Sequence, residues 1–392
     1  MNNHRRSLIM KFSINRQVLI KHLSDVQRAI SSRTTIPILT GVKISADENG
    51  IVLSGSDSDI SIETLIPVSE ENNQIEIHTQ GGIVLPARFF SEIVKKLADE
   101  KITIEVKDHF QTNITSAKAS FTINGIDVNN YPNFPVIDSN EVITLPTALF
   151  KQVIQHTVIA TSTQESRPIL TGVNMTIKDG KLTAVATDSH RLSQRIISIA
   201  APESQLEKNY NVIIPGKSLV ELSRIVENQP TIEMMITENQ VLFKAENVYF
   251  YSRLLEGYYP DTNRLIPASS STQIVLNAYD LLQATDRASL LSHEGKNNVV
   301  KLSIDSNKVE LSGNSPEVGN VEESLAYQSA SGDPLIISFN PDYMKDALRT
   351  FGQQDVQVNF TSAVRPFTVV PADREDENDN LFIQLITPVR TY

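Results

Sequence analysis

Short runs of alternating apolar and polar residues are interspersed along this chain with stretches of helical spacing. After a first strand over residues 11–14, apolar side chains from Val18 to Ile30 recur every three or four positions, which predicts an amphipathic helix. Asn15 stands directly ahead of this helix and is a plausible N-cap. Short strands follow after residue 41, with turn-forming residues between them. The pattern predicts a unit of strand, helix and three strands.

The same unit recurs to the end of the chain. Helical spacing returns over five further ranges, which are 86–98, 146–160, 216–227, 277–291 and 340–351. Strands are predicted between these helices, and in the last section they include residues 299–304, 308–311, 324–327, 356–360, 367–370 and 382–386. Helices placed among many short strands indicate the α+β class.

One hexapeptide occurs twice in the sequence. Residues 37–42 and 168–173 both read Pro-Ile-Leu-Thr-Gly-Val, and an arginine precedes each copy, Arg33 and Arg167. Weaker matches follow each copy, including an aspartate after a short strand and a Tyr-Pro pair further on. A repeat of about 130 residues has the size of a whole domain, so we expect tandem domains rather than a solenoid.

Two Pro-rich passages, 131–137 and 259–267, are interpreted as linkers between these domains. The opening residues hold too few apolar side chains for a signal peptide, so residues 1–9 are interpreted as an N-terminal extension. The acidic stretch 373–380 is interpreted as a solvated hairpin loop. The predicted domains are residues 1–137, 138–267 and 268–392.

Composition narrows the class of protein. The chain has 392 residues, of which 40% are hydrophobic and 21% charged, as in a folded globular protein. It has no cysteine, which excludes disulfides and thiol chemistry and suits a reducing cytoplasm. The apolar runs are too short to span a membrane, and we expect a cytoplasmic location.

The charge is unevenly distributed. A net charge of −11 argues against binding nucleic acid over the whole surface. The predicted helices, however, carry more Lys and Arg than Asp and Glu, whereas the rest of the chain is strongly acidic. Helices that face a polyanion would explain this difference, and ordinary solvated helix surfaces would also explain it.

The one cluster that resembles catalytic chemistry is residues 187–192, which read Thr-Asp-Ser-His-Arg-Leu. Neighbours on an extended segment point to opposite faces, so Asp188, Ser189 and His190 are not expected to form a relay. A polar loop that shapes a binding groove is the preferred function, and a hydrogen-bonded turn is the simplest alternative. Residues 215–218 resemble the end of a phosphate-binding loop, but Asn211 stands where that loop needs glycine. The seven histidines show no metal-ligand spacing.

Several motifs together resemble the bacterial sliding clamp family, the beta subunits of DNA polymerase III. They are Arg33 with residues 36–39, residues 187–192, Tyr259-Pro260-Asp261 with Arg264, Phe339-Asn340 with Tyr343, and Pro388-Val389-Arg390. The resemblance covers residues 10–392. It implies a DNA-clamp fold in which each domain holds two strand-helix-three-strand units. It further implies that two subunits close head to tail into a six-domain ring with the helices inside.

The resemblance also implies a function. Duplex DNA would thread the ring without sequence-specific contacts, and inner Lys and Arg side chains would attract its phosphates. The ring would tether the replicative DNA polymerase, the clamp loader and other replication and repair proteins that carry short clamp-binding peptides. No catalytic residue, metal or cofactor is expected. Two alternatives stay open: an enzyme with its active site around His190, and a static DNA-binding protein.

Site residues are carried over by position. The DNA-binding positions are Arg33, Gln164 and Arg167, and the dimer seam places Phe121 and Ile123 against Leu290 and Leu291. The family members' groove aromatic near Lys296 has no clear counterpart, and the chain departs from some members at Thr387, at Val389 and in its Thr391-Tyr392 end. The partner-peptide groove between the second and third domains would be lined by Leu170, Thr187, Ser189, His190, Arg191, Leu192, Pro260, Arg264, Leu265, Asn340, Tyr343, Val364, Pro366, Leu385, Thr387, Pro388, Val389 and Arg390.

Overall fold

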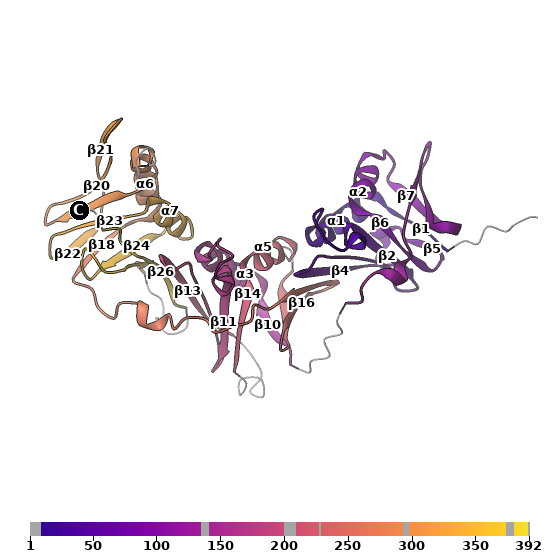
Figure 1. Cartoon of the computed structure of the whole chain (residues 1–392), viewed down its shortest axis with the longest axis horizontal. Coiled ribbons are helices and arrows are strands. Elements are labelled where there is room, and N and C mark those ends of the chain that lie inside the picture. The colour runs from indigo at the N-terminus through magenta and orange to yellow at the C-terminus, as the bar shows by residue number, and fades with distance from the viewer. Residues whose placement is uncertain are drawn as a thin grey trace, which may run out of the picture. The chain divides into compact units, whose positions relative to one another are not determined.

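A computed structural model describes residues 9–134, 141–199, 209–226, 229–292, 298–373 and 380–390 (Figure 1). Five sequence-based expectations fall outside these ranges wholly or in large part. They concern the N-terminal extension, the boundary at residue 138, most of the acidic stretch 373–380, Lys296 and the Thr391-Tyr392 end. The chain forms two compact units, one of Met1–Thr147 with Glu221–Arg253 and the other of Ala148–Val220 with Leu254–Tyr392.

The first unit contains two antiparallel sheets. One has the strand order β5-β1-β7-β8-β9 and the other the order β10-β15-β16-β17-β4-β3-β2-β6. The elements are β1 (Met10–Asn15), α1 (Arg16–Val26), β2 (Gly41–Asp47), β3 (Gly50–Ser56), β4 (Ile60–Pro67), β5 (Glu76–Thr79), β6 (Gly81–Pro86), α2 (Ala87–Lys96), β7 (Lys101–Val106), β8 (Gln111–Ser116), β9 (Ala119–Asn124), β10 (Ile143–Pro146), β15 (Thr231–Ile236), β16 (Gln240–Ala245) and β17 (Val248–Arg253).

The second unit also contains two antiparallel sheets. Their strand orders are β14-β11-β12-β13-β26-β25-β24-β18-β22 and β21-β20-β19-β23. The elements are β11 (Gly172–Lys178), β12 (Lys181–Thr187), β13 (Arg191–Ser198), β14 (Tyr210–Pro215), β18 (Thr272–Asn277), α6 (Ala278–Ser292), β19 (Val300–Asp305), β20 (Lys308–Ser315), β21 (Gly319–Ser324), β22 (Ser329–Gly332), β23 (Leu335–Phe339), α7 (Pro341–Arg349), β24 (Asp355–Phe360), β25 (Phe367–Pro371) and β26 (Phe382–Ile386). The helices α3 (Thr147–Thr157) and α5 (Gly216–Ile225) cross from one unit to the other.

The α+β class is confirmed, and every predicted helix is present with its ends shifted by a few residues. Asn15 caps α1, because its side-chain oxygen accepts the backbone N–H groups of Gln17 and Val18 at 2.9 and 3.4 Å. The helix α5 begins at Gly216 directly after β14, so the segment that resembles a phosphate loop is an ordinary strand-to-helix connection.

The strand predicted over residues 324–327 is wrong. β21 ends at Ser324, and the chain then crosses to β22 in the other sheet of the unit. The backbone N–H of Leu325 donates to Val309 in one sheet, and that of Gln328 donates to Val275 in the other, at 2.8 and 2.7 Å. Apolar side chains in this crossing segment pack on the core, so its pattern imitates that of a strand.

The helices α6 and α7 lie side by side in the second unit (Figure 1). Lys345 of α7 is buried, and its ammonium group lies 3.1 Å from Asp342 and 3.4 Å from Asp286 of α6. It also donates a hydrogen bond of 3.1 Å to the Ser289 hydroxyl. Because a buried ammonium group is tolerated only when it is paired, this lysine fixes the spacing of the two helices.

His156 gives the second unit a predictable pH dependence. Its ring stacks on Phe382 with centroids 4.0 Å apart, and its Nδ1 is buried without a hydrogen-bond partner in the described part of the chain. Burial, aided by the nearby charge of Arg195, lowers the pKa of His156 from 6.5 to about 4. The unfolded chain therefore binds a proton between pH 6.5 and 4 that the folded chain does not bind, and the free energy of unfolding falls as the pH falls through this window.

Replacing His156 by glutamine is expected to remove that share of the acid sensitivity. In the unmodified chain, the loss of unfolding free energy from pH 7 to pH 5 due to this group is about 2 kcal/mol. Urea unfolding at the two pH values, with His78→Gln at an exposed histidine as the matched control, measures the difference. An unchanged pH dependence in the His156 variant would show that the imidazole titrates normally in the folded state.

Candidate partner-binding surface

A capped turn joins β12 to β13. The Asp188 Oδ1 atom accepts the backbone N–H groups of His190 and Arg191 at 2.9 and 3.0 Å. Ser189, which lies between Asp188 and His190, adopts the left-handed backbone conformation with φ of 81°. The hydroxyl of Thr187 donates to the carbonyl of Arg191 at 2.6 Å and closes the turn from the other side. The prediction of an extended segment here is wrong, because one aspartate side chain folds it into a turn.

The Asp, Ser and His of this turn are not arranged as a catalytic relay. The second carboxylate oxygen of Asp188 accepts a hydrogen bond from Arg191 Nε at 3.0 Å. The Ser189 hydroxyl accepts one from Arg167 Nη1 at 3.1 Å. The His190 ring lies nearly parallel to that of Tyr343, with centroids 6.3 Å apart. Each of these three side chains therefore either forms a hydrogen bond within or beside the turn or faces α7.

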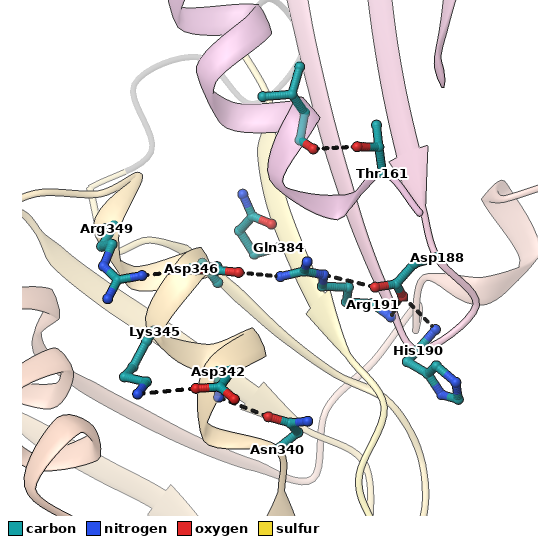
Figure 2. Close-up of polar contacts among 12 residues, drawn as sticks. Thr161, Asp188, His190, Arg191, Asn340, Asp342, Lys345, Asp346, Arg349 and Gln384 are labelled. Carbon is teal, nitrogen blue, oxygen red and sulfur yellow. Dashed lines mark hydrogen bonds and ion pairs between the residues drawn. The ribbon is translucent and has the colours of Figure 1, made fainter. Parts of the chain in front are cut away.

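Arg191 connects the turn to α7 (Figure 2). Its guanidinium lies between Asp188 and Asp346, with Nη1 2.7 Å from the Asp346 carboxylate. The same group lies 4.7 Å from the centroid of the Tyr343 ring, a cation–π distance. Its side chain is only 15% exposed, and its two ion pairs position the turn against the helix.

The helix α7 presents Tyr343 next to this turn. Asn340 caps the helix by accepting the backbone N–H of Asp342 at 2.8 Å. Tyr343 follows in the first turn of the helix, and Asp346 lies one turn further on the same face. Partial burial and the nearby Asp188 carboxylate raise the pKa of the Tyr343 hydroxyl, although the Arg191 charge opposes them. The phenol therefore stays neutral at physiological pH.

The last strand supplies the apolar floor of the surface. Leu192 of β13 lies opposite Leu385 of β26, and both pack with Val185. Tyr259 packs against the same cluster, and its hydroxyl accepts the backbone N–H of Thr187 at 3.0 Å. Beyond β26, the backbone N–H of Thr387 donates to the His190 carbonyl at 2.9 Å. The C-terminal segment is thereby fixed beside the turn.

The structure thus brings some of the predicted groove residues into direct contact. The members brought together are Thr187, Ser189, His190, Arg191, Leu192, Tyr343, Leu385 and Thr387, with Asn340 capping the helix and Val389 bonded through its backbone N–H to Ser338. For the other members, no polar contact to the turn or to Tyr343 is found in the described part of the chain. They are Leu170, Pro260, Arg264, Leu265, Val364, Pro366, Pro388 and Arg390, of which Leu265 and Val364 expose apolar side chains.

Asp346 was missed from the sequence, and the alternative of a hydrogen-bonded turn at residues 187–192 did not identify Asp188 as its cap. Asp346 stands one helical turn after Tyr343, and this spacing is the only local signal that could have pointed to it. Asp188 carried a clearer signal, because the repeat places Asp57 at the corresponding position of the first copy.

The other predicted positions lie elsewhere on the surface. Arg33 and Gln164 are exposed, and Arg167 is tied to the turn through Ser189. Phe121 and Leu290 are exposed apolar side chains, 41% and 69% accessible. Among the described residues, no group of three or more His, Cys, Asp or Glu side chains is placed to hold a metal. A search of the same residues finds no helix long and apolar enough to cross a membrane.

A charged turn held against a capped helix, beside an apolar floor, makes this surface a candidate binding site, and the chain that carries it is a multidomain α+β protein. Comparison with known proteins refines this class. Three family models match the chain, those of the N-terminal, central and C-terminal domains of the DNA polymerase III beta subunit, over residues 10–135, 144–261 and 263–390.

Relatives of known identity cover the same length. The beta sliding clamp of Bacillus subtilis is 51% identical over 386 residues, 98% of this chain and 100% of the relative, and that of Staphylococcus aureus is 44% identical over the same shares. The crystal structure of the Bacillus subtilis sliding clamp matches with a TM-score of 0.93 at 50% identity, covering 98% of this chain and all of that one. The beta chain from Streptococcus pneumoniae gives a TM-score of 0.93 at 42% identity with the same coverage.

The chain belongs to the bacterial DNA polymerase III beta subunit family, the beta sliding clamps. Its function is therefore that of a DNA sliding clamp, a processivity factor of DNA replication that catalyses no reaction itself. The resemblance predicted from the sequence motifs is confirmed.

Proposed function

We propose that two copies of this chain close head to tail around duplex DNA and hold the replicative polymerase at the template through the surface around Tyr343. The observation that carries this proposal is the full-length match to sliding clamps in both sequence and fold. We further propose that a clamp loader opens the ring, that the protein acts in the cytoplasm, and that its domains are residues 1–137, 138–267 and 268–392.

Two exposed sheet edges support a head-to-tail dimer. β9 is the last strand of one sheet of the first unit, and most of its side chains, including Phe121, are exposed. β21 is the last strand of one sheet of the second unit and is similarly exposed. An unpaired edge is a template for pairing with another chain. The proposed seam adds Ile123 from β9 and Leu290 and Leu291 from α6 to the contact.

The DNA contacts in this proposal are electrostatic. Arg33 and Gln164 are exposed and are free to reach phosphate or sugar oxygens, while Arg167 lies beside the Ser189 turn. A few such contacts in an otherwise acidic chain give weak attraction that does not depend on sequence. Retention on DNA then comes from the closed ring rather than from tight binding.

The partner site in this proposal is built on Tyr343. An aromatic ring flanked by His190, with exposed Leu265 and Val364 in the same unit, offers apolar area to a leucine or phenylalanine of a partner peptide. The Arg191 guanidinium holds the ring and the turn in place before a partner arrives. A preorganised site loses less entropy on binding, so a short peptide suffices.

Replacing Tyr343 by alanine is expected to weaken binding of a short peptide with leucine and phenylalanine anchors by tenfold or more, since a buried aromatic contact contributes about 2 kcal/mol. His190→Ala is expected to weaken it less, and His78→Ala, at an exposed histidine of the first unit, not at all. Fluorescence anisotropy of a labelled peptide measures the affinity, and sedimentation checks that each variant keeps its oligomeric state. Equal affinity for Tyr343→Ala and the unmodified chain would remove this surface from the proposal.

A further inference from the structure

The capped turn after β12 and the strands that pack beside it, together called the junction, have a counterpart in the first unit at the other copy of the sequence repeat. Asp57 Oδ1 accepts the backbone N–H groups of Asp59 and Ile60 at 2.7 and 2.8 Å, as Asp188 does for the corresponding residues of its turn. The backbone N–H of Arg253 donates to the Asp59 carbonyl at 2.9 Å, which repeats the bond from Thr387 to His190. The strand after each turn pairs with a strand from a later part of the chain, β4 with β17 and β13 with β26.

The flanking parts of the junction are repeated as well. The segments Pro37–Thr40 and Pro168–Thr171 both form short 3-10 helices, and each places one leucine, Leu39 or Leu170, at 4% exposure. Tyr131 is buried and packs with Leu39, as Tyr259 packs with Leu192. The two junctions therefore share one backbone frame.

A cavity of about 360 Å³ opens at the junction of the first unit. One wall is apolar and is formed by Ile36, Leu39, Phe134 and Tyr251. The rings of Phe134 and Tyr251 lie 5.7 Å apart, and Ile36 is 47% exposed. A hollow of this size with an aromatic wall accepts one or two apolar side chains of a partner.

The polar part of the lining differs in charge from the surface around Tyr343. Asp57 and Asp59 line the cavity, against Arg253 as its only cation among the described lining residues. Ile60 stands where the other junction has Arg191, so no arginine of the turn neutralises Asp57. Asp59 stands where the other junction has His190. The first unit thus offers two carboxylates where the second offers an imidazole and a guanidinium.

We propose that this cavity is a second peptide-docking site, and that its occupant is a short segment of a partner protein with an apolar anchor next to lysine or arginine. The anchor packs against Phe134 and Ile36, and the basic side chain pairs with Asp59 and Asp57. The proposal rests on the proposed peptide-binding role of the equivalent surface around Tyr343. Because the two turns differ in charge, the two sites select different peptides, and one clamp holds two kinds of partner at once.

The test uses the full chain and two labelled peptides, Gly-Phe-Leu-Lys-Arg-Gly and a matched control with glutamate in place of lysine and arginine. Asp59→Lys is expected to weaken binding of the basic peptide by tenfold or more and to strengthen binding of the acidic one. Asp59 is exposed and its side chain is not the one that caps the turn, so folding is expected to be unaffected, as thermal unfolding will check. Ile36→Asp is expected to weaken binding of both peptides.

Tyr343→Ala separates the two sites. It is expected to leave binding of the basic peptide largely unchanged, because the Arg191 guanidinium beside Tyr343 repels lysine and arginine. It is expected to weaken the peptide with leucine and phenylalanine anchors that tests the proposed function. If Tyr343→Ala abolishes binding of the basic peptide and Asp59→Lys does not, the second site does not exist. No measurable binding of the basic peptide at millimolar concentration also overturns it. If Tyr343→Ala fails to weaken binding of the peptide that tests the proposed function, while Asp59→Lys acts on the basic peptide as expected, only the proposed function is overturned.

Discussion

Replacing Leu290 and Leu291 together by alanine is expected to convert the proposed dimer into monomers of 43.5 kDa. Leu290 exposes 69% of its surface on the last turns of α6, so its side chain is available for contact with another chain. Covering one leucine contributes about 1.5–3 kcal/mol, so the double change removes up to about 3–6 kcal/mol from each seam. That loss weakens each seam by roughly two to four powers of ten.

Sedimentation at micromolar concentration measures this result. Ile336→Ala is the matched control, because Ile336 is 59% exposed on β23 of the same unit and lies outside the proposed seam. The double variant is also expected to dissociate from circular DNA, because an open ring does not enclose the duplex. A double variant that sediments as a dimer at the same concentration as the unmodified chain would place the seam elsewhere.

Replacing Phe367 by alanine is expected to lower the free energy of unfolding of the second unit by about 3–5 kcal/mol, the range for deleting a buried phenylalanine ring. Phe367 is fully buried in β25, and its ring lies 5.7 Å from that of Phe339 and 5.2 Å from that of Phe360. Removing it leaves a cavity among aromatic rings that cannot collapse without moving three strands.

Urea unfolding measures this effect, with Phe89→Ala as the control at a phenylalanine that is 63% exposed on α2. The control is expected to change the unfolding free energy by about 0.5 kcal/mol or less. Because the chain has two compact units, two transitions are fitted, and only that of the second unit is expected to shift. A shift below about 1 kcal/mol would mean that the core around Phe367 is not close-packed.

The elements that sequence analysis predicted well are those specified by local pattern. The helix from Arg16 to Val26 is set by apolar spacing and by the Asn15 cap, and both signals are local. The segment 325–327 was misassigned because its apolar side chains reach the core while its backbone passes between two sheets. Periodicity reports which side chains are buried, and it does not report which backbone groups are paired.

The site was predictable only in part for a related reason. The repeat and the family motif pointed to the residues of the turn, but Arg191 meets Asp346 across 155 positions of sequence, and no local signal predicts that distant partner. The extended conformation expected at Asp188 was wrong because side-chain capping overrides the strand pattern there. The same capping at Asp57 shows that the repeat specified a structure as well as a sequence.

Negative-stain electron microscopy of the purified protein tests most directly whether the chain closes around DNA. Rings with an open centre and six lobes are expected, with three domains from each of two copies. Compact particles without a central hole, at concentrations where sedimentation shows a dimer, would contradict this expectation.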